Sequence, residues 1–185
     1  MRPNDSSTLL AELTTLRRRT RSDLDSGGWR WMFVWAAVSA GFVVALAVPA
    51  LHGLAAGYWA FGVPVGVLGT MATDLLHRER RVRRREWPYW ATALAITVAN
   101  VAGSFLLPTG WMLVWLWIVL ASGFSVLLWL ERERVASRLL AAQAILFAVV
   151  SPFVTSRLGA SVVMGAVFTL VLVATGWLGL SRERA

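Results

Sequence analysis

The sequence predicts an all-α integral membrane protein, with six transmembrane helices arranged as three hairpin repeats after a short amphipathic N-terminal helix. The first observation behind this prediction is composition. Of the 185 residues, 57% are hydrophobic and 15% are charged, whereas soluble domains have about 45–50% apolar and about 25% charged residues. The second is a set of six apolar stretches, each with the roughly 20 residues that a helix needs to cross a bilayer core about 30 Å thick. Such a composition also excludes intrinsic disorder.

Residues 1–30 are expected to form a cytoplasmic, basic amphipathic helix followed by a hinge. Leucines recur at helical spacing after a cap at Asp5 or Ser6. Two roles stay open: an interfacial helix whose arginines meet anionic lipid, or a docking helix for a cytoplasmic regulatory partner. A Ser-Gly-Gly sequence at 26–28 then provides the hinge. The basic side chains of this helix are Arg17, Arg18, Arg19 and Arg21.

The predicted spans are separated by connections that alternate between very short and charged. Those after the first, third and fifth spans hold two or three residues, and those after the second and fourth carry runs of Arg and Glu. This alternation pairs the spans into hairpins at 31–76, 87–130 and 135–180 of a transmembrane domain at 31–180, followed by a tail at 181–185. The spans are placed at Trp31–Leu51, Leu54–Leu76, Trp87–Leu107, Trp111–Leu130, Val135–Ser156 and Gly159–Leu180.

The distribution of arginine predicts the orientation of the chain. All 18 basic residues are arginine, against 10 acids, and only Arg157 falls on the side opposite the charged connections. Because positively charged loops stay in the cytoplasm, we expect both termini there and the chain in a plasma membrane. Topology and contact with anionic lipids explain the basic run after the second span, so we expect no nucleic-acid partner. The arginines of that run include Arg81, Arg83, Arg84 and Arg85.

Tryptophan supports the same layout. The amphipathic indole ring favours the headgroup layer, so tryptophans near span ends are expected to anchor the chain at a fixed depth. Trp115 and Trp117 lie deeper and flank opposite helix faces, so we expect at least one of them inside the bundle. The expected anchors are Trp29, Trp31, Trp35, Trp87, Trp90 and Trp129 at the cytoplasmic side, and Trp59 and Trp111 at the external side.

Two sequence features recur with the hairpins. Arg-Glu-Arg closes each hairpin, at 78–80, 132–134 and 182–184. Small residues also recur at every fourth position of the first, third and fifth spans. Because helices in lipid associate through close backbone approach, these stripes are expected to face one another or their hairpin partners, or else to mediate a homo-oligomer. The stripes are Ala37, Gly41, Ala45 and Pro49; Ala91, Ala95, Ala99 and Gly103; and Leu140, Ala144, Ala148 and Pro152, where only Leu140 departs from the pattern.

Three polar side chains inside the predicted spans are candidate functional residues. Asp74, in the last turn of the second span, either pairs with Arg78 at the interface or takes a proton or a cation during transport. Asn100, near the middle of the third span, needs a hydrogen-bond partner. It either bonds another helix, with Gln143 as the expected partner, or contacts a substrate. Pro64 is expected to break the second span beside a cavity.

No catalytic or cofactor-binding pattern is present. His52 and His77 lie on opposite sides of the predicted membrane, so they cannot share a metal ion or a catalytic triad. The sequence has no HExxH motif, no phosphate-binding loop and no cysteine. We therefore expect no enzyme activity, no catalytic residue, no metal and no cofactor.

Two short segments carry a resemblance to known membrane proteins. The segment LRRRTRSDL at 16–24, followed by a tryptophan-rich first span, resembles small uncharacterised six-span integral membrane proteins of high-GC bacteria, often encoded beside winged-helix regulators. The hairpin at 87–130, with Asn100 in its first helix and Trp111, Trp115 and Trp117 in its second, is similar to bacterial two-span (2TM) hairpin domains. The resemblance implies a membrane-bound partner of a regulatory system and assigns no functional residue.

Three functions from different classes stay open. The first is a non-enzymatic sensor or scaffold that engages a cytoplasmic or membrane partner through its basic segments. The second is a small transporter, or the membrane subunit of one, for a hydrophobic or cationic compound. The third is an intramembrane enzyme acting on lipid, against which the absence of a nucleophile and base pair counts.

Overall fold

The computed structural model describes residues 12–13, 29–75 and 87–184, and within them the chain is helical, without strands. Five helices are long and apolar enough to cross a membrane, or six if the bent pair Pro49–Ala55 and Gly57–Thr73 forms one span. The all-helical prediction is thereby confirmed at the level of helices of membrane length. The elements in order are α2 (Arg30–Ala47), η1 (Pro49–Leu51), α3 (His52–Leu75), α4 (Trp87–Leu106), α5 (Thr109–Leu130), α6 (Arg134–Val150), η3 (Ser151–Phe153) and α7 (Arg157–Arg184).

Several expectations lie outside the described residues. They concern the amphipathic N-terminal helix and the basic connection between α3 and α4, so these expectations stay predictions. The arginines concerned are Arg17, Arg18, Arg19, Arg21, Arg81, Arg83, Arg84 and Arg85.

Proline sets two helix ends that differ from the predicted spans. Proline has no backbone N–H and clashes with the preceding helical turn. Accordingly α2 stops at Ala47, four residues before the predicted end, and Pro49 begins the short 3₁₀ turn η1. In the same way α6 stops at Val150, and Pro152 lies inside η3. Each turn lies between two successive long helices, at the point where the chain reverses.

Pro64 does not break α3, which corrects the expectation of an interruption there. The helical segment Gly57–Thr73 runs through this proline. The bend lies earlier, where Pro49–Ala55 meets Gly57–Thr73 at an angle of 54°. A kink in this hairpin therefore lies near its turn rather than at the middle of the helix.

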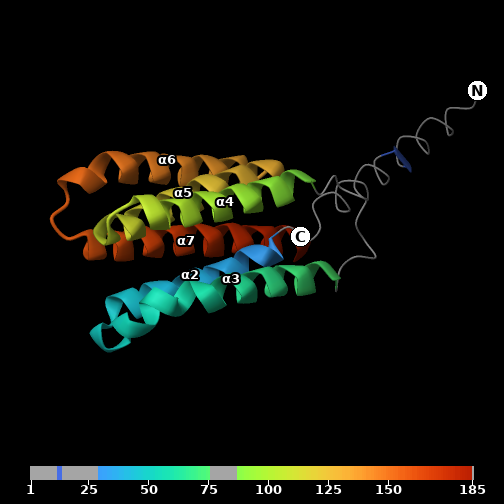
Figure 1. The fold of residues 1–185 in the computed structure, drawn as a ribbon. Helices are drawn as coiled ribbons and strands as arrows, with labels where there is room; N and C mark the ends of the chain where they lie inside the picture. The colour runs from blue at the N-terminus through green and yellow to red at the C-terminus, as the bar shows by residue number, and fades with distance from the viewer. Residues whose placement is uncertain (1–11, 14–28, 76–86, 185) are drawn as a thin grey trace, which may run out of the picture.

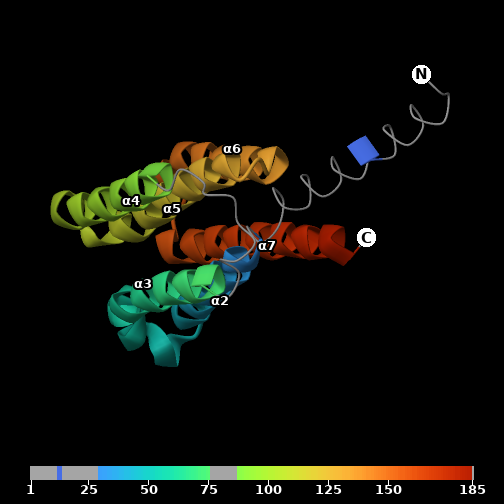
Figure 2. The same ribbon diagram turned by 90° about the vertical axis from the view of Figure 1, so that its right-hand side faces the viewer.

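The last helix of the chain occupies the centre of the bundle. In Figures 1 and 2, α7 lies between α2 and α3 on one side and α4, α5 and α6 on the other. It packs against α2, α5 and α6, whereas α3 packs mainly on α2, and α4 mainly on α5. Each predicted hairpin has its two helices in contact, but the most extensive interfaces, α2 with α7 and α5 with α6, join different hairpins. The threefold repeat therefore stays a prediction.

Aromatic side chains from α2, α5 and α7 fill the core. Phe42 of α2 lies 5.9 Å from Trp117 of α5 between ring centroids, and Trp117 lies 5.6 Å from Phe168 of α7. Phe124 continues the stack, with its ring centroid 5.2 Å from that of Phe168. Trp117, Phe42 and Phe168 are completely or almost completely buried. Edge and tilted contacts of this kind add to the gain from burying the apolar area itself.

Glycines allow these large rings to approach the backbone. A Cβ on Gly165 of α7 would collide with Trp117 and with Val43 of α2. A Cβ on Gly103 of α4 would collide with Trp115, whose indole Nε1 donates to the Ala99 carbonyl at 2.8 Å. Glycines at these positions thus leave room for tryptophan rings, and they also let helix backbones approach each other.

The predicted small-residue stripes are only partly directed inward. Their packed members include Gly41, which lies against the Tyr58 ring, and Gly103. The other members divide between the two sides of the helices. Ala45, Leu140 and Ala144 are buried, whereas Ala37, Ala91, Ala95 and Ala148 are exposed.

Candidate functional site

The described arginines separate toward the two ends of the molecule. Arg30 begins α2, and Arg182 lies in the last turn of α7, at the end where α3 finishes and where α4 and α6 begin (Figure 1). Arg132 lies between α5 and α6 at this same end, Arg134 begins α6, and Arg138 follows one turn later. We call this end, formed by Arg30, Arg132, Arg134, Arg138 and Arg182, the arginine-rich end. Arg157 begins α7 at the opposite end.

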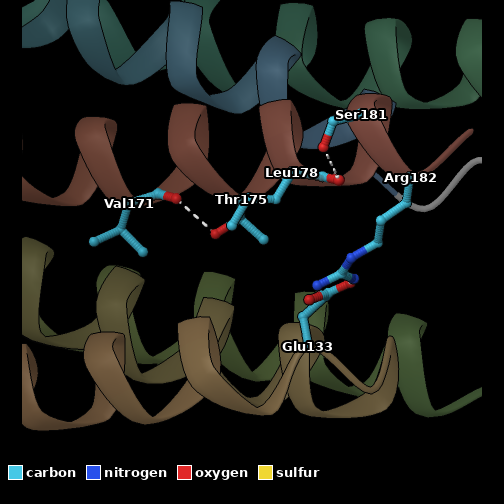
Figure 3. Close-up of polar contacts among 6 residues, drawn as sticks. All are labelled: Glu133, Val171, Thr175, Leu178, Ser181 and Arg182. Carbon is cyan, nitrogen blue, oxygen red and sulfur yellow. Dashed lines mark hydrogen bonds and ion pairs between the residues drawn. The ribbon is translucent and has the colours of Figure 1, made fainter. Parts of the chain in front are cut away.

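An ion pair connects two of the Arg-Glu-Arg motifs at the arginine-rich end. Arg182 Nη1 donates to Glu133 Oε1 at 2.6 Å, which joins the last turn of α7 to the residue before α6 (Figure 3). The side chain of Arg182 is 62% exposed and that of Glu133 28%. Water therefore screens the pair, and its contribution to stability is about 0–1 kcal/mol. It orients the end of α7 more than it stabilises the fold.

The turn between α5 and α6 has a defined backbone. Arg132 has φ 64°, in the left-handed region that few residues other than glycine adopt. This conformation lets the Glu133 amide donate to the Leu128 carbonyl at 2.9 Å and the Arg132 amide to the Trp129 carbonyl at 3.0 Å, which caps α5. The Arg134 guanidinium lies 5.8 Å from the Trp129 ring centroid. The turn therefore presents its arginines in a fixed arrangement.

Two serines join α5 to α6 just inside this turn. Ser125 Oγ donates to the Ser137 carbonyl at 2.8 Å, and Ser137 Oγ donates to the Ser125 carbonyl at the same distance. Both side chains are buried. In a dry interior a reciprocal pair of this kind satisfies both hydroxyl groups and fixes the register of the two helices. Sequence reasoning missed these residues, because a single serine in an apolar run is common, and its partner is set by tertiary packing.

The predicted polar residues do not form one site. Asn100 Nδ2 donates to the Ile96 carbonyl of its own helix at 3.0 Å. Gln143 Nε2 donates to the Met164 carbonyl of α7 at 2.8 Å. Across the described residues no hydrogen bond joins Asn100 to Gln143, so the expected pairing is wrong. Its physical reason is that α4 packs mainly on α5, while Gln143 faces α7. Asp74 lies in the last turn of α3, and its side chain is outside the described part.

Several buried polar atoms have no hydrogen-bond partner in the described part of the chain. Near one turn of α7, the three are Trp117 Nε1, Gln143 Oε1 and Ser161 Oγ. Trp117 packs against Gly165, and Gln143 binds the adjacent Met164, so both reach the same turn of α7 from α5 and α6. Unpaired polar atoms cost free energy in a dry interior. We call this turn of α7, together with the three unpaired atoms near it, the polar spot of the core. Of these three residues, the sequence predicts Gln143 as a candidate functional residue and Trp117 as a candidate core residue.

Among the described residues, no group of three or more His, Asp, Glu or Cys side chains could hold a metal ion. His52 instead uses Nε2 for a 2.9 Å contact with the Leu46 carbonyl, at the end opposite the arginine-rich one. This contact closes the α2–α3 turn, which gives the histidine a structural role.

Together these features define a bundle of membrane-length helices with a basic end and an aromatic core. No protein-family model matches the chain, and comparisons with curated proteins and with solved structures found no significant match.

Proposed function

We propose that this chain is a non-enzymatic multi-pass protein of the bacterial plasma membrane that acts as a scaffold or sensor. In this proposal its arginine-rich end faces the cytoplasm and engages an acidic surface of a regulatory partner protein. Anionic lipids of the inner leaflet neutralise the arginines that the partner does not contact. The membrane location rests on the length and apolar character of the helices.

The observation that carries the proposal is the exposure of charge at the arginine-rich end. Arg132, Arg134, Arg138 and Arg182 are exposed, while Glu131 and Glu133 are half-buried. The left-handed backbone at Arg132 defines the turn that carries the exposed Arg132 and leads to the exposed Arg134. Guanidinium groups bind carboxylates through paired hydrogen bonds, so such a surface favours an acidic partner.

The core supports a scaffold more than a carrier. Every buried side chain of the described residues is apolar or is a serine or a threonine, so the described core contains no buried ionisable group. Carriers of charged compounds commonly place ionisable groups at membrane depth. The aromatic stack of Phe42, Trp117 and Phe168 instead fills the junction of three helices.

Site-specific photo-crosslinking in cells tests this function. A photo-crosslinking amino acid replaces Arg132, at the arginine-rich end, or Gly53, an exposed residue at the other end where an added Cβ would have no atom within 4 Å. We expect a protein adduct, identified by mass spectrometry, from position 132 and none of the same mass from position 53. Arg134→Gln combined with Arg138→Gln should reduce the adduct at least about twofold, because charge guides the encounter.

Two results of the crosslinking experiment would contradict the proposal. Position 132 yielding lipid adducts alone, or the same protein adduct as position 53, contradicts partner binding at this end. An adduct that persists unchanged in the double arginine variant contradicts the acidic-surface mechanism.

One observation favours a second candidate, a small transporter or the membrane subunit of one for a hydrophobic or cationic compound. The unpartnered atoms Trp117 Nε1, Gln143 Oε1 and Ser161 Oγ offer a polar spot inside the bundle. If the protein moves a compound past this spot, Gln143→Leu should abolish export, measured as accumulation of a lipophilic cationic dye. Thr97→Val, an exposed position of α4, is the matched control. Equal accumulation in the wild type and the Gln143 variant excludes this candidate.

A further inference from the structure

Arg157 is an isolated charge at the end opposite the arginine-rich one. Residues 31–73, 87–130 and 139–180 contain a single charged residue, Arg157, and no Asp or Glu. The short connections at this end therefore hold no carboxylate that could pair with its guanidinium. The five N–H groups of this guanidinium are therefore available to an anion from outside the chain.

The guanidinium is held in place despite this lack of a carboxylate. Its Cζ lies 4.2 Å from the centroid of the Trp111 ring, in the first turns of α5. Its Nη1 lies 3.0 Å from the position that a Cβ on Gly110 would occupy. The indole ring covers one face of the guanidinium. The opposite face of the guanidinium and its outer N–H edge are available for a ligand.

Two helices begin beside the guanidinium of Arg157. Arg157 is the first residue of α7, and its side chain reaches the first turn of α5. A helix N-terminus carries about half a positive charge, whereas the C-termini of α4 and α6, at Leu106 and Val150, carry the opposite sign. The cation–π contact with Trp111 favours the guanidinium at this place, and an anion bound to it would also meet the backbone N–H groups that begin α5.

We propose that Arg157, stacked on Trp111, binds the phosphate group of a membrane phospholipid. The phosphate accepts hydrogen bonds from the guanidinium and lies near the N-terminus of α5. Exposed apolar side chains, Phe153 and Leu158, flank Arg157 along the chain and offer a surface to an acyl chain. This apolar surface favours a lipid over free phosphate. The proposal rests on the membrane location given above and is independent of a cytoplasmic partner.

Native mass spectrometry of the full chain, released from mild detergent, tests the site. The probes are phosphatidylglycerol, a diacylglycerol with the same acyl chains but no phosphate, and glycerol phosphate without acyl chains. We expect the wild type to bind one more phosphatidylglycerol than Arg157→Gln does. The affinity of the wild type for that lipid should be at least about tenfold tighter, because hydrogen bonds between charged groups are stronger than those between neutral groups. Diacylglycerol should bind both proteins equally.

Two further variants separate the site from general effects of folding or charge. Trp111→Leu keeps the positive charge but removes the stack, and should also lose the additional lipid. Arg182→Gln removes a charge at the arginine-rich end and should leave the Arg157-dependent lipid bound. Thermal unfolding in lipid-free detergent verifies that each variant is folded. If Arg157→Gln does not fold, Trp111→Leu and Gly110→Ala, which displaces Nη1, carry the test.

Three results overturn the proposal. The first is an equal number of phosphatidylglycerol molecules on the wild type and on the folded variants at this site. The second is Arg157-dependent binding of diacylglycerol, which excludes phosphate recognition. The third is glycerol phosphate binding as tightly as the lipid, which identifies a site for free phosphate instead. None of these results depends on the crosslinked partner, so the lipid site and the proposed function fail separately.

Discussion

Gly165 is the residue at which three helices of the bundle meet. Its missing side chain accommodates Trp117 of α5 and Val43 of α2 against the backbone of α7. Trp117 is completely buried, and its ring atoms would lie within 3 Å of a Cβ on Gly165. A methyl group at this position therefore requires the three helices to separate.

Gly165→Ala should accordingly destabilise the protein by about 1–3 kcal/mol, the usual cost of overpacking a core. Gly57→Ala is the matched control, because nothing lies within 4 Å of the Cβ it adds. The control should be neutral or slightly stabilising, since alanine favours helix. Thermal unfolding in detergent measures both changes. Equal thermal unfolding midpoints for Gly165→Ala and Gly57→Ala would show that the space around Gly165 can hold a methyl group.

Tryptophan positions show how far sequence reasoning reaches at this scale. Trp87, Trp90 and Trp129 are exposed, as expected of side chains that contact headgroups. Trp31 is instead buried, with its ring centroid 5.7 Å from that of Phe124. Depth along a helix can be read from the sequence, but the helix face that meets a neighbour depends on which helices pack together. In the deeper pair, the expectation that at least one ring packs inside is confirmed by Trp117.

Among the elements, α5 and α6 are joined by the reciprocal serine pair. Each hydroxyl donates to the backbone carbonyl of the other serine, so removing one hydroxyl leaves the opposite hydrogen bond intact. We expect Ser125→Ala and Ser137→Ala each to cost about 0.6 kcal/mol, the mean for hydrogen bonds between membrane helices. Neighbouring residues often give non-additive changes, but each of these hydrogen bonds ends on a backbone carbonyl, so the double variant should cost about the sum of the two.

Ser104→Ala serves as the control for this pair, because its exposed hydroxyl bonds only the Asn100 carbonyl of its own helix. Unfolding by added denaturing detergent gives the free-energy differences. A double variant that costs no more than either single variant would mean that the two hydroxyls act as one unit, through the 3.3 Å contact between their Oγ atoms.

Helix existence was predictable from the sequence, whereas helix ends and polar partners were less so. The extent of each apolar run predicts a helix of membrane length, because lipid leaves no alternative for the backbone. Helix ends such as Ala47 and Val150 depend on the prolines that follow them. The predicted spans continued past these prolines, whereas the helices stop before them. The partner of Gln143 could not be predicted, because it lies on α7 and depends on the order of helices around the bundle.

For the molecule as a whole, orientation is the property that most needs a direct measurement. The described arginines separate to one end, with Arg157 at the other. The sequence contains no cysteine, so a single introduced thiol reports one position without background. We expect Val82→Cys to be labelled by an impermeant maleimide only from the cytoplasmic face of sealed vesicles, and Thr109→Cys only from the other face. Labelling of both positions from the same face contradicts the transmembrane arrangement.

Hairpins were predictable from the alternation of short and charged connections, but the order of helices around the bundle was not. In lipid, the hydrophobic effect gives no preference for one apolar face over another, so side-chain fit decides which helices meet. Here that fit is between particular rings and glycines, such as Trp117 with Gly165 and Trp115 with Gly103. A periodic stripe of alanine and glycine does not specify which ring will occupy it.

The central place of α7 has a consequence for biosynthesis. α7 follows α2, α5 and α6 in the chain, and all three pack against it. Before α7 is inserted, Trp117 lacks Phe168 and Gly165 as neighbours, so we expect the earlier helices to associate less tightly in the bilayer. A message truncated before α7 would thus yield an unfinished bundle that membrane proteases can recognise. We therefore expect the interior of the bundle to close only once α7 is inserted.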